Sequence, residues 1–289
     1  MGGFFALYSW HMSKIGVFDS GYGGLTVLKS LVNALPEMHF VYLGDNARAP
    51  YGDRSFDTVY HYTRDCVNWL FEHDCDLVIL ACNTASAKAL RQIQQVDLPK
   101  RTDNKRVLGV IRPTTESVGD FTQSQHIGIL GTQGTVKSES YKIEIAKFFP
   151  SIHVTQEACP IWVHLVENNL LGLEGTDFFV NYHIQRLLAA DNQIDAIFLA
   201  CTHYPLLLES ILKVVPSTVK VVSQGDLVAQ KLVDYLKRHP EFATKLLKDG
   251  QREFFTTDQF NDFDSQAGKF YGEIISAKRV EIPQKIEHS

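Results

Sequence analysis

Two cysteines occupy matching places in a short stretch of sequence that the chain contains twice. Residues 76–84 read DLVILACNT, and residues 195–203 read DAIFLACTH. In each copy an apolar run ends in Ala-Cys and two polar residues, so Cys82 and Cys201 hold equivalent positions. A single free cysteine is often only a small buried apolar side chain. Two cysteines at equivalent places in a repeat favour a shared chemical role instead.

Two thiols on opposite walls of one cleft suit the inversion of a stereocentre. One thiolate removes a proton from carbon, and the other thiol delivers a proton to the opposite face. The ordinary pKa of a thiol, about 8.5, can be tuned by neighbours, so both protonation states are usable near neutral pH. Asn83 and Thr84 follow the first cysteine, and Thr202 and His203 follow the second. Together with N–H groups at the start of the next helix, they can bind carboxylates.

A glycine-rich turn, DSGYGG at 19–24, follows the first predicted strand and adds two further candidates. Its glycines let the backbone approach a ligand closely, and its spacing differs from the GxGxxG of dinucleotide-binding folds. Asp19 is a candidate partner for Cys82, with Ser20 beside it, while His203 can assist Cys201. The turn PYGD at 50–53 is either a plain turn or a binding loop, and we favour binding because functional residues concentrate in loops.

Apolar runs of strand length alternate with helical patterns along the chain. The predicted strands are 15–18, 39–44, 77–81, 106–111, 126–131, 152–158, 196–200, 219–223 and 254–258. The predicted helices are 26–35, 55–73, 84–95, 135–148, 161–169, 176–190, a helix after Pro205, 225–237 and a short final helix. Continuous apolar strands between helices indicate parallel sheets covered on both faces.

The repeat extends beyond the cysteines, because IGVFDSGYGG at 15–24 corresponds to IGILGTQGTV at 127–136. Two correspondences in the same order predict an α/β fold with two pseudo-symmetric open parallel-sheet domains. Parallel sheets bind ligands at the carboxyl ends of their strands. Two such halves facing each other would share a single cleft.

Composition excludes several classes of protein. The net charge is −5 and no long Lys/Arg cluster occurs, which argues against a nucleic-acid partner. No apolar run reaches the roughly 18–20 residues of a membrane helix. The five cysteines show neither CxxC pairs nor metal-ligand spacing, which predicts free thiols in a reducing cytoplasm. Residues 1–13 precede the first patterned segment and look like an extension without signal-peptide features.

Several motifs together resemble those of the aspartate/glutamate racemase family, and of its glutamate racemases in particular. They span about residues 14–233 and read IGVFDSGYGGLTVL, YLGDNARAPYG, LACNTASA, GVIRP, IGILGT, ACPIWVHLVE, ACTHYPLL and SQGDLVA. The resemblance implies interconversion of L- and D-glutamate, which supplies D-glutamate for peptidoglycan synthesis and cell shape. It also implies that no cofactor and no metal is needed, and that the protein is a homodimer.

The same resemblance assigns roles to individual residues. Cys82 would handle the proton of the D-enantiomer and Cys201 that of the L-enantiomer, with Asp19, His203 and Glu167 assisting the thiols. The implied substrate-binding positions are Asp19, Ser20, Tyr51, Gly52, Asn83, Thr84, Thr202 and His203. The first domain would comprise 14–108 plus 222–289, around a second domain at 109–221.

Three alternatives remain open at this point. A racemase of aspartate or another amino acid would share the mechanism and differ in the length of its pocket. A cysteine hydrolase would use Cys201 with His203 and leave Cys82 idle. A non-enzymatic protein would bind an amino acid or a protein partner without turnover.

Overall fold

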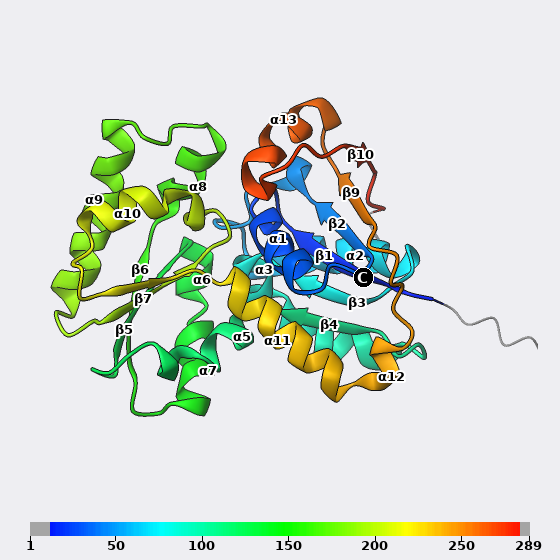
Figure 1. Ribbon diagram of the computed structural model, residues 1–289, viewed down its shortest axis with the longest axis horizontal. Coiled ribbons are helices and arrows are strands. Elements are labelled where there is room, and N and C mark those ends of the chain that lie inside the picture. The colour runs from blue at the N-terminus through cyan, green and yellow to red at the C-terminus, as the bar shows by residue number, and fades with distance from the viewer. Residues whose placement is uncertain (1–11, 284–289) are drawn as a thin grey trace, which may run out of the picture.

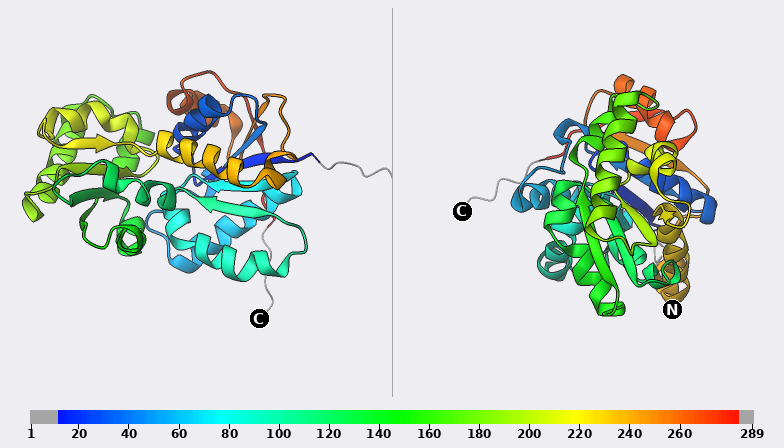
Figure 2. Two further views of the ribbon diagram at one scale, coloured as in Figure 1. Left: turned by 60° about the horizontal axis from the view of Figure 1, so that its bottom comes forward. Right: turned by 90° about the vertical axis from the view of Figure 1, so that its left-hand side faces the viewer.

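The chain folds into two lobes that lie side by side, each built on one parallel sheet (Figure 1). The structure is a computed structural model and describes residues 12–283. Most of the predicted extension 1–13 therefore lies outside the described residues. The two lobes also stay distinct after a turn about the horizontal axis (Figure 2, left).

The first lobe contains a six-stranded sheet in the order β10-β9-β2-β1-β3-β4. Its strands are β1 Lys14–Asp19, β2 Phe40–Gly44, β3 Cys75–Leu80, β4 Arg106–Gly109, β9 Arg252–Thr256 and β10 Ala277–Arg279. Helices α1 Gly24–Ala34, α11 Gly225–Arg238 and α13 Phe260–Tyr271 pack on one face. Helices α2 Phe56–Glu72, α3 Asn83–Lys88 and α4 Leu90–Gln92 pack on the other.

The second lobe contains a four-stranded sheet in the order β6-β5-β7-β8. Its strands are β5 His126–Gly131, β6 His153–Ala158, β7 Ala196–Ala200 and β8 Lys220–Val222. Helices α8 Pro160–Glu167, α9 Glu174–Ala190 and α10 Leu208–Val214 cover one face. The other face packs against α5 Ile111–Thr115 and α7 Ser140–Phe148, with α6 Gln133–Lys137 directly after β5. The short helix α12 Pro240–Ala243 follows α11 in the first lobe.

The predicted α/β class and the internal repeat are confirmed by the strand order. The order β2-β1-β3-β4 in one sheet matches β6-β5-β7-β8 in the other. The repeated sequences form β1 and β5, together with the neighbouring strands β3 and β7. Every position of β7 is buried, as a parallel strand between two helical layers requires.

The C-terminal part of the chain returns to the first lobe, where β9 pairs with β2 and α11 packs on α1. The sheets extend one residue past each predicted domain end. Gly109 pairs with Leu80 in the first sheet, and Val222 pairs with Phe198 in the second. The domain boundaries themselves stay a prediction.

Some predicted elements end earlier than their apolar pattern suggests. The strand predicted at 106–111 ends at Gly109, because the Ser86 hydroxyl accepts the N–H of Val110 at 3.3 Å and α5 begins directly afterwards. The helix predicted at 135–148 is interrupted at Glu139, whose φ is +55°. There the Ser138 hydroxyl accepts the N–H of Ser140 at 3.2 Å and competes with helical hydrogen bonding.

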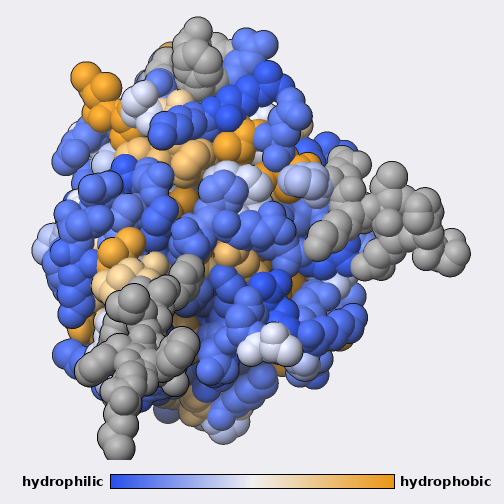
Figure 3. Space-filling model, turned by 90° about the vertical axis from the view of Figure 1, so that its right-hand side faces the viewer, coloured by the Kyte–Doolittle hydropathy of each residue, from blue (hydrophilic) through white to orange (hydrophobic). Residues whose placement is uncertain are grey.

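Helix α2 begins where its sequence predicts. The side chain of Ser55 accepts the N–H of Thr58 at 3.1 Å, which is a regular N-cap. Among the helices of residues 12–283, none combines the length and the hydrophobicity that spanning a membrane requires. The outer face of the first lobe is mainly hydrophilic, with hydrophobic side chains scattered over it (Figure 3).

Candidate active site

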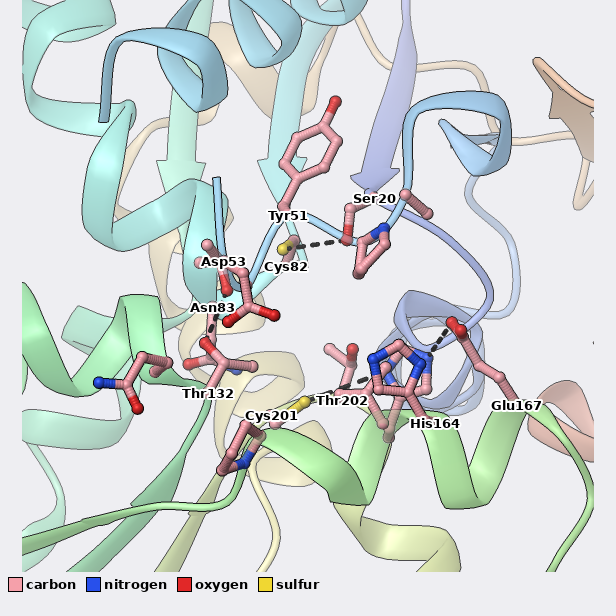
Figure 4. A pocket seen from close by; sticks show the side chains of 18 residues that line it. Ser20, Tyr51, Asp53, Cys82, Asn83, Thr132, His164, Glu167, Cys201 and Thr202 are labelled. Carbon is pink, nitrogen blue, oxygen red and sulfur yellow. Dashed lines mark hydrogen bonds and ion pairs between the residues drawn. The ribbon is translucent and has the colours of Figure 1, made fainter. Parts of the chain in front are cut away.

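A pocket lies between the lobes, at the carboxyl ends of the strands of both sheets (Figure 4). Both cysteines of the repeated sequence line it, and each is almost fully buried, with 6% exposure for Cys82 and 5% for Cys201. All the predicted site residues except Asp19 line this pocket: Ser20, Tyr51, Gly52, Cys82, Asn83, Thr84, Glu167, Cys201, Thr202 and His203.

Cys82 stands between the end of β3 and the start of α3. Its Sγ atom lies 3.4 Å from the Ser20 hydroxyl and accepts the N–H of Ala85 at 3.4 Å. Burial and the nearby negative charge of Asp19 raise the pKa of the Cys82 thiol to about 12, although the Ser20 and Ala85 hydrogen bonds oppose the rise. At neutral pH this thiol is therefore protonated and able to donate.

Cys201 follows the end of β7 and faces a different set of partners. Its Sγ lies 3.9 Å from Nδ1 of His203, and Nε2 of His203 lies 2.9 Å from a carboxylate oxygen of Glu167. Burial alone would lower the pKa of His203, but the hydrogen bonds to Cys201 and Glu167 outweigh it and raise that pKa to about 10. The positive charge of the protonated His203 therefore lies next to the Cys201 sulfur.

Asp19 lies behind the pocket wall and links the two lobes. It is fully buried, its Oδ1 accepts the N–H of Gly21 at 2.9 Å, and its Oδ2 accepts the hydroxyl of Thr202 at 3.4 Å. Burial raises its pKa, while the positive charge of His203 and the N–H groups of Gly21 and Gly24 oppose the rise. Asp19 therefore does not line the pocket. It acts on the pocket through its charge near Cys82 and through its hydrogen bond with Thr202.

The turn that carries Asp19 packs so closely against the second lobe that Gly23 has no room for a side chain. A Cβ atom on Gly23 would lie 2.2 Å from the Thr202 hydroxyl and 2.5 Å from Nδ1 of His203. The glycine at this position therefore lets the end of β1 pack directly against the residues that follow Cys201.

Two predicted binding residues have their polar side-chain atoms engaged within the protein. The hydroxyl of Tyr51 donates to Asp45 and points away from the thiols (Figure 4). The amide of Asn83 donates to Gln224 at 2.6 Å and accepts the hydroxyl of Tyr141 at 2.7 Å. These two residues shape the wall while their side-chain polar groups are already hydrogen-bonded.

The structure adds lining residues that the sequence analysis does not single out: Ala49, Thr132, Gln133, Pro160, Val163 and His164. Pro50 and Asp53, from the predicted PYGD binding loop, also line the pocket. The hydroxyl of Thr132 lies 2.9 Å from that of Thr84 and joins the lobes. The repeat offered a signal for it, because Thr132 corresponds to Ser20 when 127–136 is aligned with 15–24. His164 precedes Glu167 by three residues on α8, a spacing that places both on one helix face.

The positive charge in the pocket comes from the His203 imidazolium and not from lysine or arginine. None of its lining residues is Lys or Arg. Four hydroxyls, those of Ser20, Thr84, Thr132 and Thr202, belong to the wall instead. Such groups can hold an anionic ligand by hydrogen bonding, and they leave the two sulfur atoms as the main reactive groups.

A family model and individual relatives assign this chain to the same family. The family description Asp/Glu/Hydantoin racemase matches residues 15–232. A glutamate racemase of Dinoroseobacter shibae is 38% identical over 277 residues, covering 92% of this chain and 98% of the relative. A glutamate racemase of Bacillus cereus is 36% identical, covering 90% of this chain and 94% of the relative.

Solved structures agree with the sequence relatives. A glutamate racemase isoform of Bacillus anthracis has a TM-score of 0.85 at 33% identity and covers 94% of this chain and 99% of its own. A glutamate racemase of Francisella tularensis, solved with D-glutamate, has a TM-score of 0.82 at 29% identity and covers 94% of this chain and 98% of its own. This chain therefore belongs to the Asp/Glu/hydantoin racemase family.

Proposed function

We propose that the protein is a glutamate racemase, an isomerase that interconverts L- and D-glutamate and supplies the D-enantiomer for peptidoglycan synthesis. The observation that carries the proposal is the placement of Cys82 and Cys201 in one pocket, each from a different lobe. The choice of glutamate as the substrate is supported by glutamate racemases that this chain matches over nearly their whole length.

The reaction needs two proton transfers on opposite faces of the α-carbon. In the direction from L to D, the Cys201 thiolate takes the α-proton and the Cys82 thiol gives its proton to the carbanion. Cys201 ends as a thiol and Cys82 as a thiolate, so the reverse reaction uses the same two groups in exchanged roles. The surroundings of the two cysteines match their roles in the L-to-D direction, because the pKa of Cys82 is raised and the His203 imidazolium lies beside Cys201.

Assisting roles follow from the contacts of each thiol. His203, held by Glu167, stabilises the thiolate of Cys201, and Asp19 keeps the Cys82 thiol protonated. We assign substrate binding to the wall around both thiols: Ser20, Tyr51, Gly52, Asn83, Thr84, Thr202 and His203, with Asp19 acting from behind. For Tyr51 and Gly52 the backbone N–H is the available donor.

The proposal predicts where solvent hydrogen enters the product. In D2O the newly formed enantiomer carries deuterium at the α-carbon, because the donating thiol exchanges its proton with solvent. The loss of the circular dichroism signal follows racemisation, and the loss of the α-proton signal in proton NMR follows deuterium incorporation. L-glutamate, D-glutamate and L-aspartate are tested as separate substrates. We expect turnover of both glutamate enantiomers and little of aspartate.

Replacing either thiol should stop racemisation in both directions. We expect Cys82→Ser and Cys201→Ser each to lower kcat at least 10³-fold, roughly 4 kcal/mol of barrier, because a serine hydroxyl is a far weaker acid. Cys75→Ser is the matched control, since Cys75 is buried in β3 on the strand that leads to Cys82. Full activity in Cys82→Ser would contradict the two-thiol mechanism, and hydrolysis of an amide that needs only Cys201 would indicate a cysteine hydrolase.

We further propose that the protein is a cytoplasmic homodimer. The support is the resemblance of its motifs to a family whose members dimerise, together with five free cysteines in the structure. Light scattering during size-exclusion chromatography should give twice the chain mass of 32.6 kDa. A mass of one chain at micromolar concentration would contradict the dimer, and recovery of the native protein outside the cytoplasmic fraction would contradict the location.

A further inference from the structure

A cluster of two histidines and one aspartate lies in the second lobe, outside the catalytic pocket. It comprises His126, His153 and Asp191, and their potential ligand atoms all lie within 4.8 Å of one another. His126 is the first residue of β5, five residues before the strand ends at Gly131. At about 3.3 Å per residue this places the cluster about 16 Å from the pocket end of the sheet.

The fold fixes all three side chains in place. His126 and His153 are directly paired in the register of β5 and β6, and their rings stack with centroids 5.1 Å apart. Asp191 is the C-cap residue of α9, and its Oδ1 accepts the N–H of Gln193 at 3.0 Å. Two strands and the end of one helix therefore converge on a single point.

Three polar side chains approach one oxygen atom of the Asp191 carboxylate. Oδ2 of Asp191 lies 2.8 Å from Nδ1 of His126, 3.3 Å from Nδ1 of His153 and 3.4 Å from the hydroxyl of Thr155. His126 and Thr155 hydrogen-bond to this oxygen, and Nδ1 of His153 adds a third polar atom beside it. A cation placed among the two imidazole nitrogens and Oδ2 would use their lone pairs and leave Thr155 as the hydrogen-bond donor.

We propose that His126, His153 and Asp191 form a binding site for a divalent first-row transition metal ion such as Zn²⁺. Two imidazoles and a carboxylate suit zinc and its neighbours better than Mg²⁺ or Ca²⁺, which prefer oxygen ligands. Tetrahedral zinc places its ligand atoms about 3.3 Å apart, close to the 2.8 Å and 3.3 Å found here. The His153 side chain is 61% exposed, so water has access to complete the coordination.

The bound ion would fasten β5, β6 and the end of α9 together at the edge of the sheet that faces away from the pocket. Its role would be to stabilise the second lobe, since ligand binding to the folded state alone shifts unfolding in favour of that state. At zinc concentrations about a hundredfold above Kd, we expect Tm to rise by roughly 5 °C.

The test must separate this cluster from the thiols, which also bind zinc. The parent protein is the full chain carrying Cys82→Ser and Cys201→Ser, in which serine keeps an N-cap acceptor at position 82. Equilibrium dialysis with Zn²⁺, read by elemental analysis, gives the metal content per chain. The matched control is His61→Gln, because His61 also pairs with an aspartate, Asp57, at 3.2 Å and is half-exposed.

We expect His153→Gln to lose one equivalent of Zn²⁺ and the zinc-dependent rise in Tm, while His61→Gln keeps both. Equal zinc content in the two variants, or no zinc on the parent protein, would overturn the proposal. A second measurement needs no variant of the cluster: Zn²⁺ should slow the modification of His153 by diethyl pyrocarbonate in the parent protein, as read by peptide mass spectrometry. An unchanged rate at His153 would also count against the site.

Discussion

At the scale of single residues, the two thiols of the pocket are equivalent in sequence and unequal in surroundings. Burial, together with the neighbouring carboxylate of Asp19, raises the pKa of Cys82 to about 12. Cys201 lies 3.9 Å from a histidine that is itself held by Glu167. The two walls therefore surround their thiols with different charges, a carboxylate near Cys82 and an imidazolium near Cys201. In the proposed two-thiol mechanism, this asymmetry suits an enzyme that acts on two mirror-image substrates.

The reactivity of Cys82 should depend on the charge of Asp19. Because only the thiolate is alkylated, a lower pKa gives faster reaction with iodoacetamide at fixed pH. We expect Asp19→Asn to speed the alkylation of Cys82 roughly three- to tenfold at pH 8.5, since it removes a negative charge near the sulfur. Peptide mass spectrometry distinguishes Cys82 from Cys201.

Asp53→Asn is the matched control, because Asp53 also lines the pocket. We expect its alkylation rate at Cys82 to stay within about twofold of the wild type, well short of the Asp19→Asn effect. Identical rates in both variants would show that Asp19 carries no charge beside the thiol.

The charge of His203 should make stability depend on pH. Its pKa is about 10 in the folded chain, above the 6.5 of a free histidine. The folded state therefore binds the extra proton between pH 6.5 and 10, so the free energy of unfolding falls as pH rises through this window. Glu167→Gln removes a partner that raises this pKa, and the fall should become smaller and end at lower pH.

Urea unfolding at pH 6 and pH 10 measures this effect. At pH 6 we expect Glu167→Gln to cost about 1.5–3 kcal/mol, the usual range for a hydrogen bond to a charged group. Glu174→Gln, an exposed carboxylate at the start of α9, serves as the control and should behave as the wild type. An unchanged pH dependence in Glu167→Gln would mean that the carboxylate does not hold the imidazolium.

At the scale of elements, the turn between β1 and α1 brings the lobes together. Gly23 stands at the start of α1 with ordinary helical angles, so only space restricts this position. A side chain there would have to displace Thr202 and His203, which follow Cys201 in the sequence. The position of this turn is thus set by packing across the cleft and not by backbone conformation.

Gly23→Ala should therefore damage both packing and catalysis. We expect a loss of about 1–3 kcal/mol in the free energy of unfolding, as for overpacked sites, and at least a tenfold loss of kcat/KM. Gly175→Ala is the matched control, because nothing lies within 4 Å of the added Cβ on α9. Alanine there should be neutral or stabilise slightly. Equal stability and activity in the two variants would show that the close approach of Gly23 is not required.

At the scale of the whole molecule, a buried network fixes the relation of the lobes beside the pocket. Gln224, which follows β8, accepts the amide of Asn83 at 2.6 Å and donates to the hydroxyl of Thr114 at 2.8 Å. Tyr141 on α7 donates to Asn83 at 2.7 Å. The hydrogen bond between Thr84 and Thr132 adds a second link between the halves.

Tyr141→Phe should leave the buried oxygen of Asn83 without its donor. An unsatisfied buried polar group costs about 1–3 kcal/mol, and we expect that loss in urea unfolding. Tyr182→Phe is the control, because Tyr182 is 48% exposed on α9. If the two variants were equally stable, the network would not contribute to the stability of the folded chain.

The amino-acid sequence alone predicts the parallel α/β class, the two repeated halves and the position of each thiol at a strand end. These features are local, since apolar periodicity and a repeated stretch are visible within a few tens of residues. Residues such as Ser20, Thr202 and His203 were predicted because they stand next to those strand ends. The sequence does not predict the interruption at Glu139, because hydrogen bonds of the two flanking serines produce it without disturbing the apolar pattern.

The directions in which the side chains of the site face become visible only in the folded chain. The tertiary structure placed Asp19 behind the wall, turned the Tyr51 hydroxyl toward Asp45, and tied Asn83 to Gln224, 141 residues further along the chain. It also set Thr132 opposite Thr84. These partners are fixed by packing between segments that are distant in sequence, and such contacts leave no periodic signal in either segment.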